Sequence, residues 1–225
     1  MSTAAARDAE SDRPGKRTLL LRFLVVALLV VADQWSKSAV FDWLEGGILT
    51  VEGMEIDRHG HDRFPVAGGE EGPLANGFLD LGFMLVLNPG AAFGKFGDFP
   101  HVLVGGRLIA AALLSWLLLR ARKGEGLGLV ALVLVLSGAL GNLIDNLWTG
   151  PTKEGHPYGL VRDFIDAWFL RWDFHFHTFN VADACISVGA VAWILSGLLH
   201  RAPAEEGGES VPAQDAERPG DSPAT

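Results

Sequence analysis

The stretch LGLVALVLVLSGALGNLI, residues 127–144, decides the fold, because none of its 18 positions carries a charge. A helix needs about 20 consecutive apolar residues to cross the hydrocarbon of a bilayer. The stretch therefore predicts a membrane-spanning helix and excludes a purely soluble protein. The average composition of the 225 residues, 49% hydrophobic and 20% charged, hides this signal because it blends unlike parts.

Three further segments have nearly the length that a helix rising about 1.5 Å per residue needs to cross a membrane. The four predicted spans are Leu19 to about Val40, Val102–Leu119, Leu127–Asp145 and about Val181 to Leu199. The first is not a cleavable secretory signal, because the polar pair Asp33-Gln34 follows its apolar run and no small-x-small cleavage site is evident.

Basic residues set the predicted orientation, because Lys and Arg are enriched in short loops on the cytoplasmic side of a membrane. They flank the start of the first span, fill the turn between the second and third, and follow the fourth: Lys16, Arg17 and Arg22, then Arg120, Arg122 and Lys123, then Arg201. Both termini are therefore predicted to be cytoplasmic. Residues 41–101 and 146–178 then form the extracytoplasmic connections.

The chain divides into one four-span domain, residues 18–200, and two tails. Residues 1–17 and 201–225 are rich in small, polar and acidic residues and are predicted to be disordered cytoplasmic tails. Within the first connection, the Gly-rich and charged residues 45–76 predict an irregular loop. Residues 77–88 (GFLDLGFMLVLN) predict an extended segment.

Charge and cysteine content exclude two other classes of protein. The net charge of -9 argues against broad nucleic-acid binding. The single cysteine, Cys185, excludes a disulfide scaffold. We expect Cys185 to be a small buried hydrophobe, because no neighbouring base or cation would activate its thiol.

Polar residues gather at the outer ends of the predicted spans, where each is expensive and is by default a functional hypothesis. They form pairs spaced three or four residues apart, which places both members on one helical face: Asp33 and Lys37, Asn142 and Asp145, Asn180 and Asp183. Three separate segments thus deliver Asn and Asp to one membrane level. Asp163 and Asp166 lie in the connection before the fourth span, and Asn88 ends the extended stretch.

Each of these residues also has an ordinary structural explanation. Asn180 is a suitable N-cap for the fourth span, with Asp183 near the positive end of the helix dipole. Asn142 is suited to an interhelical hydrogen bond. Asp166 fits a solvated charge on an amphipathic face, and Arg107 fits a partner for buried Asp33 or Asp145.

Metal binding is the weaker hypothesis for this chain. His175 with His177, and His59 with His61, form two short clusters, but neither spacing matches a specific ligand set. The sequence also contains no G-x-S-x-G, H-E-x-x-H or P-loop pattern.

Five stretches occur in an order that resembles the lipoprotein signal peptidases, the membrane aspartic peptidases also called signal peptidase II. They are DQWSK (33–37), NPGAAFG (88–94), GNLID (141–145), VRDFID (161–166) and FNVADA (179–184). Each motif alone is weak, whereas all five in order on four spans are highly specific. The resemblance covers roughly residues 19–199.

The resemblance implies a role for each matched position. The two catalytic aspartates of the family fall on Asp163 and Asp183. Its active-site asparagines fall on Asn88, Asn142 and Asn180, and its supporting polar residues on Asp33, Lys37 and Asp145.

The chain departs from the family pattern in three places. Asn146 stands where the family usually has Arg, Arg162 precedes the first catalytic aspartate where an apolar residue is common, and the loop at 45–76 is longer than usual. The first departure leaves open how Asp145 is neutralised, with Arg107 and Arg162 as candidates.

The expected chemistry follows from two carboxyl groups that share one proton and hold one water. Like charges a few ångströms apart do not both ionise, so one carboxyl acts as general acid and the other as general base, without metal or cofactor. The helix dipole favours Asp183 as the base. The resemblance implies that the substrate is a diacylglyceryl-modified bacterial prolipoprotein, cut before its lipidated cysteine.

The predicted fold is an all-α membrane protein of the bacterial cytoplasmic membrane. It is a four-helix bundle with a small extracytoplasmic β-containing region and an interfacial amphipathic segment, 164–176, that lies on the membrane and covers the site. We expect a monomer whose other partners are membrane lipids. Two rival functions are an ion relay through Asp33, Asp145 and Asp183, and a non-catalytic membrane scaffold.

Overall fold

The computed structural model describes residues 14–45, 48–51, 54–57, 63–68, 77–89, 99–122 and 126–199. Several sequence expectations fall outside these residues. They are almost all of both predicted tails, the cluster of His59 and His61, and the part of the NPGAAFG stretch that follows Pro89.

Four long helices form the body of the protein, as the hydropathy predicted. They are α2 (Lys16–Glu45), α3 (Pro100–Arg120), α4 (Gly126–Ile144) and α5 (Val181–Leu199). Each is long and apolar enough to cross a membrane. Since their outer faces expose large apolar side chains such as Leu28, Ile109 and Ile194, the bundle is suited to lipid rather than water.

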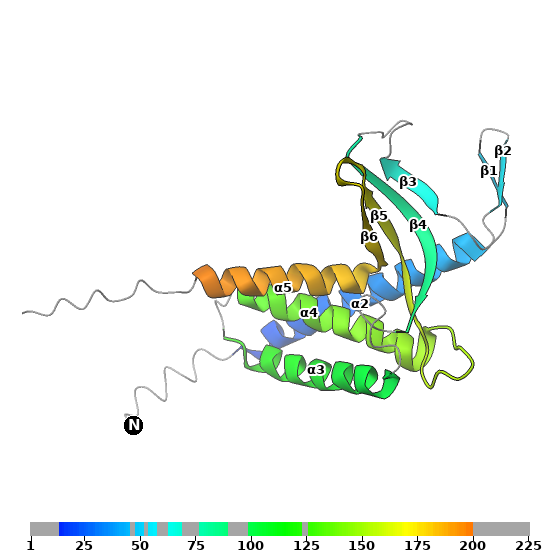
Figure 1. Cartoon of the computed structure of the whole chain (residues 1–225). Coiled ribbons are helices and arrows are strands. Elements are labelled where there is room, and N and C mark those ends of the chain that lie inside the picture. The colour runs from blue at the N-terminus through cyan, green and yellow to red at the C-terminus, as the bar shows by residue number, and fades with distance from the viewer. Residues whose placement is uncertain are drawn as a thin grey trace, which may run out of the picture.

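The helices run side by side, and the sheet stands at one end of the bundle (Figure 1). The turn between α3 and α4 lies at the opposite end. There the buried side chain of Arg22 donates to the carbonyl oxygens of Leu118 (3.0 Å) and Ala121 (2.8 Å). These are C-terminal carbonyls of α3 that lack helical partners, so Arg22 caps this helix.

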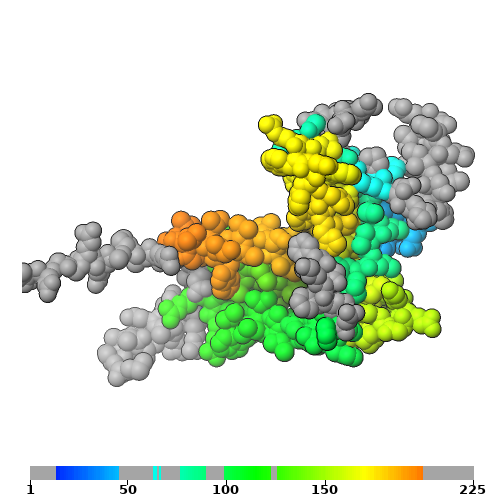
Figure 2. Space-filling view, viewed as in Figure 1, coloured from blue at the N-terminus to red at the C-terminus, as the bar shows by residue number. Residues whose placement is uncertain are grey.

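An antiparallel sheet of four strands projects from the other end (Figures 1 and 2). In sheet order its strands are β3 (Phe64–Gly68), β4 (Leu79–Asn88), β5 (Val161–Phe169) and β6 (Phe174–Phe179). A separate hairpin joins β1 (Ile48–Val51) to β2 (Met54–Asp57). The predicted extended segment at 77–88 is confirmed as β4.

One local prediction was wrong, since the irregular loop expected at 45–76 contains β1, β2 and β3. The segment 164–176, predicted to lie on the membrane, consists of most of β5, a short turn and the start of β6. The sequence VRDFIDAWF is rich in β-branched and aromatic residues, which favour a strand that pairs on both edges. An all-α description is therefore too narrow, since the sheet contributes part of the site described below.

Glycines allow α4 and α5 to pack closely. A Cβ atom added at Gly189 on α5 would lie 2.7 Å from the side chain of Val135 on α4. One added at Gly141 would lie 2.6 Å from a carboxylate oxygen of Asp33 on α2. Any larger residue would push the helices apart, so these glycines bring the polar ends of α2, α4 and α5 together.

Candidate active site

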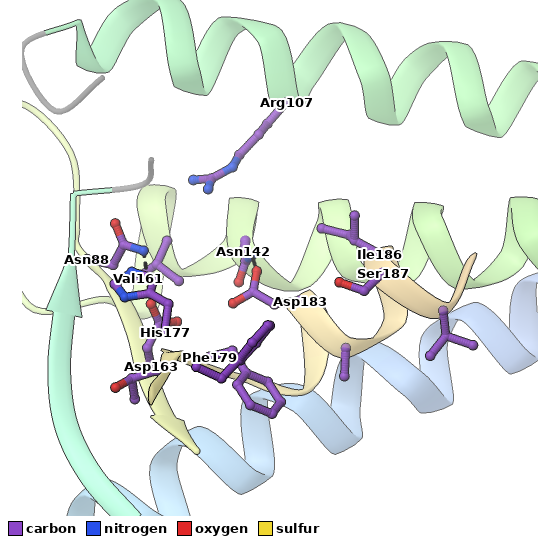
Figure 3. Close-up of a pocket in the computed structure, with 14 residues that line it drawn as sticks. Asn88, Arg107, Asn142, Val161, Asp163, His177, Phe179, Asp183, Ile186 and Ser187 are labelled. Atoms are coloured by element: carbon purple, nitrogen blue, oxygen red, sulfur yellow. Dashed lines mark hydrogen bonds between the residues drawn. The ribbon is translucent and has the colours of Figure 1, made fainter. Parts of the chain in front are cut away.

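A cavity of about 530 Å³ lies where the sheet meets the helices, and both candidate catalytic aspartates line it. Asp163 comes from β5 and Asp183 from the first turn of α5 (Figure 3). Asn88 and Asn142 lie at the same cavity. Residues that are far apart in the sequence thus converge there, as the motifs predicted.

Asp163 is held by two amide groups and is only 1% exposed. The Nδ2 atoms of Asn180 and Asn88 donate to its two carboxylate oxygens at 2.6 Å and 2.9 Å. Burial, reinforced by the negative charge of Asp183, raises the pKa of Asp163 to about 7, although the two amide bonds oppose this shift. Asp163 is therefore suited to carry a proton near neutral pH.

Asp183 is less enclosed and begins α5. Its backbone N–H donates to Asn180 Oδ1 at 2.9 Å, while the N–H of Asn180 reaches back to Asp183 Oδ2 at 3.3 Å. This reciprocal pair caps the helix. The N-cap explanation of Asn180 is thus correct, and the same side chain also holds Asp163. Asn142 Nδ2 fixes the other oxygen of Asp183 at 2.8 Å.

A buried ion-pair cluster supports these residues from behind. Lys37 is fully buried and lies 2.8 Å from Asp33 and 3.1 Å from Asp145, and its Nζ donates to Asn142 Oδ1 at 3.0 Å. Asp33 in turn accepts from the backbone N–H of Ala182 at 2.8 Å. The cluster therefore ties α2 to α4 and to the start of α5, which fixes the position of Asp183.

Arg162 answers how Asp145 is neutralised where Asn146 replaces the arginine of the family pattern. Its Nη2 lies 2.8 Å from Asp145 Oδ1, and its backbone N–H donates to Asp145 Oδ2 at 3.0 Å. A π-helical turn, Asp145–Thr149, carries Asp145 at the end of α4. Together with Lys37, Arg162 balances this buried carboxylate.

Arg107 occupies a different place from the one expected. The ion pairs of Asp33 and Asp145 are made by Lys37 and Arg162, whereas Arg107 Nη1 donates to the side-chain oxygen of Asn146. Arg107 also lines the cavity (Figure 3). The sequence showed a charged residue within an apolar helix, but it did not show toward which other residues that side chain would point.

Asp166 was wrongly predicted to be solvated, since it is 0% exposed. It pairs with Arg63 of the chain before β3, and it lies 2.6 Å from His175 Nε2 and 3.3 Å from the hydroxyl of Thr178. Gly82, its partner on β4, leaves the space through which the Arg63 side chain passes. Asp166 thus braces the sheet outside the cavity. The β-branched and aromatic residues of 161–169 were the signal in the sequence that could have predicted a strand here, and with it the burial of Asp166.

The candidate metal ligands are divided between separate places. His175 contacts Asp166, whereas His177 lines the cavity. Within the described part of the chain, no group of three or more His, Cys, Asp or Glu side chains is arranged to hold a metal ion. Two carboxyls, those of Asp163 and Asp183, meet at the cavity and suit proton transfer.

A model of the family described as signal peptidase (SPase) II matches residues 25–199. The chain belongs to this family. It is therefore a membrane-embedded protease of the aspartic class, and the motif resemblance found in the sequence is confirmed.

Curated relatives support the assignment of this chain to the signal peptidase II family. A lipoprotein signal peptidase of Cupriavidus necator is 38% identical over 202 residues, covering 88% of this chain and 94% of the relative. A lipoprotein signal peptidase of Syntrophus aciditrophicus is 30% identical over 183 residues, covering 78% and 91%.

Two solved structures share the fold of this peptidase. Both are described as a bacterial membrane enzyme, and both are 26% identical to it. One has a TM-score of 0.54 and covers 80% of this chain and 88% of its own. The other has a TM-score of 0.52 and covers 81% and 94%.

Proposed function

We propose that the protein removes the signal peptide from diacylglyceryl-modified bacterial prolipoproteins, cutting before the lipidated cysteine with a water activated between Asp163 and Asp183. The observation that carries this proposal is the convergence of the two aspartates on one cavity, where burial and Asp183 raise the pKa of Asp163 to about 7. The names of the curated relatives support the substrate class.

The unequal surroundings of the two carboxyls support distinct roles. Asp183 lies at a helix N-terminus, and its carboxylate accepts from the backbone N–H of Asn180 and the amide of Asn142. It takes a proton from water as the oxygen attacks the scissile carbonyl. Protonated Asp163 donates to the carbonyl oxygen. When the C–N bond breaks, Asp183 returns its proton to the leaving nitrogen, and Asp163 recovers one from the tetrahedral hydroxyl. Protons balance over the cycle, and no covalent enzyme intermediate forms.

Asn88, Asn142 and Asn180 position this pair. Their amides hold the carboxylates by donating hydrogen bonds and carry no charge of their own, so the two carboxyls still share one proton. Asp33, Lys37 and Asp145 support the position of α5 from outside the cavity.

The cavity is apolar along α5, where Ile186 and Val188 line it. This wall suits the apolar residues of a signal peptide or the acyl chains of the modified cysteine, and membrane lipids are the natural surroundings. Both aspartates come from one chain, which supports an active monomer. By the positive-inside rule the cavity faces the extracytoplasmic side of the cytoplasmic membrane. Reporter fusions after Leu44 and Trp172 should then be external, and fusions after Lys123 internal.

The deciding experiment is cleavage of a diacylated prolipoprotein by the purified full-length protein in detergent, with EDTA present. We expect release of the intact signal peptide with a new N-terminus at the lipidated cysteine. An unmodified prolipoprotein should be cut far more slowly. Failure to cleave in EDTA with recovery on adding zinc would refute the metal-independent mechanism and favour a role for His177.

A further inference from the structure

Arg107 is a charged residue of α3, and the residues next to it in this helix carry no charge. It lies in the outer half of α3, which has Leu108 and Ile109 directly after it, and Ile109 is 71% exposed on the outer face. An arginine at such a depth is expensive, so it is expected to act within the protein interior. The structure directs its side chain inward, to the cavity that holds both aspartates.

One edge of the Arg107 guanidinium is anchored. Nη1 donates to Asn146 Oδ1, and Asn146 is itself fixed, because its Nδ2 donates to the carbonyl oxygen of Gly159 at 2.8 Å and its own carbonyl accepts from the Gly159 N–H at 2.9 Å. A guanidinium has five N–H donors in a rigid fork. The anchor therefore sets the direction in which the other donors point.

That direction is into the cavity that both aspartates line. Figure 3 shows the Arg107 side chain extending from α3 toward the space between Asn88 and Asn142. The carboxylates that attract it electrostatically are those of Asp183, Asp163 and Asp145, in decreasing order. Asp145 already has two close cations, Lys37 and Arg162. The positive charge of Arg107 therefore acts mainly on the pair in the cavity.

We propose that Arg107 is a substrate-binding residue of this active site: its guanidinium donates to a peptide carbonyl oxygen beside the scissile bond while its charge balances the single negative charge of the aspartate pair. This inference rests on the proposed function. The peptide then lies between α3 and the two aspartates. A cation there stabilises the ionised aspartate that activates water, as well as the oxygen of the bound substrate.

Replacing Arg107 alters no other residue, so the other charged and titratable side chains around this site are still present in the variant. They are Asp33 and Lys37 on α2, His101 on α3, Asp145 after α4, Arg162 on β5 and His177 on β6. A shift in the acidic limb of the pH profile on replacing Arg107 is therefore attributable to its own charge.

The test compares Arg107→Gln and Arg107→Lys with Arg120→Gln in the full-length protein, using the diacylated prolipoprotein. Arg120 lies on the same helix but is exposed, 4.8 Å from the ring of Trp116, and is expected to leave cleavage unchanged. Arg107→Gln should lower kcat/KM by about 10²-fold, with a higher KM, and move the acidic limb of the pH profile up by about one unit. Arg107→Lys should be intermediate and should keep the limb near its original pH.

Three results would overturn the inference. The first is a folded Arg107→Gln enzyme whose kcat/KM and acidic limb match those of Arg120→Gln. The second is a loss of activity at every pH with no movement of the limb, which indicates a structural role. If Arg107→Gln does not fold, Arg107→Lys decides, and an unchanged KM in that variant counts against substrate binding. Absence of cleavage by the wild type and Arg120→Gln would instead refute the proposed function.

A second substrate distinguishes whether Arg107 donates to a carbonyl of the peptide or to an ester carbonyl of the lipid. With an ether-linked diacylglyceryl group, which lacks ester carbonyls, the Arg107→Gln penalty should persist if a peptide carbonyl is the ligand. Disappearance of the penalty would overturn that assignment in favour of the lipid ester.

Discussion

Two pairs of aspartates lie next to each other in this molecule and have opposite surroundings. Asp33 and Asp145 contact Lys37, and Asp145 also contacts Arg162, so this ion-pair cluster is balanced by cations. Asp163 and Asp183, in the cavity, are instead held by the amides of three asparagines.

The difference teaches what makes a buried aspartate structural or reactive. A cation at about 3 Å pairs with a carboxylate and ties together the segments that carry the two charges, so Asp33 and Asp145 brace the helices. Amide donors satisfy the oxygens without supplying a full charge. Asp163 thus has a pKa of about 7, raised by burial and then by Asp183. The predictions below test this division from its largest consequence to its smallest.

The largest effect is expected in the cavity. Asp163→Asn and Asp183→Asn should each lower kcat by about 10³-fold or more, because asparagine keeps the shape but cannot transfer the proton. The double variant should be scarcely worse than either single one, since members of one catalytic unit are not additive. Cleavage kinetics of the folded, membrane-inserted variants provide the measurement.

The matched control is Asp173→Asn. Asp173 is exposed at the turn between β5 and β6 and has a φ of 45°, a left-handed conformation that asparagine tolerates. It should cleave as the wild type does. If the losses of the two single variants multiply, the aspartates act independently, and the shared water is wrong.

In the ion-pair cluster the effect should be on stability. Lys37→Met removes the cation that serves both Asp33 and Asp145 and leaves buried carboxylates uncompensated. Breaking a buried pair in this way lowers the free energy of unfolding by about 3–5 kcal/mol. Thermal unfolding in detergent measures it. A variant as stable as the wild type would show that Arg162 and the amides suffice to balance the cluster.

Asp166 lies outside both groups and should behave as a brace of the sheet. Asp166→Asn weakens charged hydrogen bonds to Arg63 and His175, so we expect a loss of about 1–3 kcal/mol in the free energy of unfolding. Cleavage below the unfolding temperature should fall only a few-fold. An inactive but folded Asp166→Asn variant, with Asp163→Asn still cleaving, would exchange the roles assigned to these two residues.

The smallest effect is a shift in pH dependence. Asn88 donates to the ionised form of Asp163 and so lowers its pKa, which means that Asn88→Leu should raise this pKa above about 7. Because Asp163 acts in its protonated form, the alkaline fall in kcat/KM should move to higher pH, by roughly half a unit to one unit. A pH–rate profile measures the shift. If the acidic rise in kcat/KM moved to higher pH instead, Asp163 would be working as the base.

The spans and the site motifs could be predicted because their signals are local. An uninterrupted apolar run predicts a helix whatever surrounds it, and α5, Val181–Leu199, agrees with the approximate bounds that hydropathy indicated. The spacing of Asn180 and Asp183 likewise predicted a helix cap, which the two hydrogen bonds confirm.

The sheet could be predicted only in part, because strands depend on partners far along the chain. β4 was expected, whereas β5 and β6 were expected to lie on the membrane surface. The aromatic and β-branched residues of 161–169 fit either environment. Pairing of β5 with β4 and β6 is what makes this segment a strand and buries Asp166.

The sequence by itself determined that this chain is a four-span membrane peptidase, since apolar length and the order of five motifs do not depend on how the chain packs. Only the tertiary structure decided which cation serves which carboxylate. Arg162, next to Asp163 in sequence, balances Asp145, and Arg107, in the first half of an apolar helix, reaches the cavity. The physical reason is that electrostatic interactions act over a few ångströms of space, and those distances are set by packing between segments far apart in the chain.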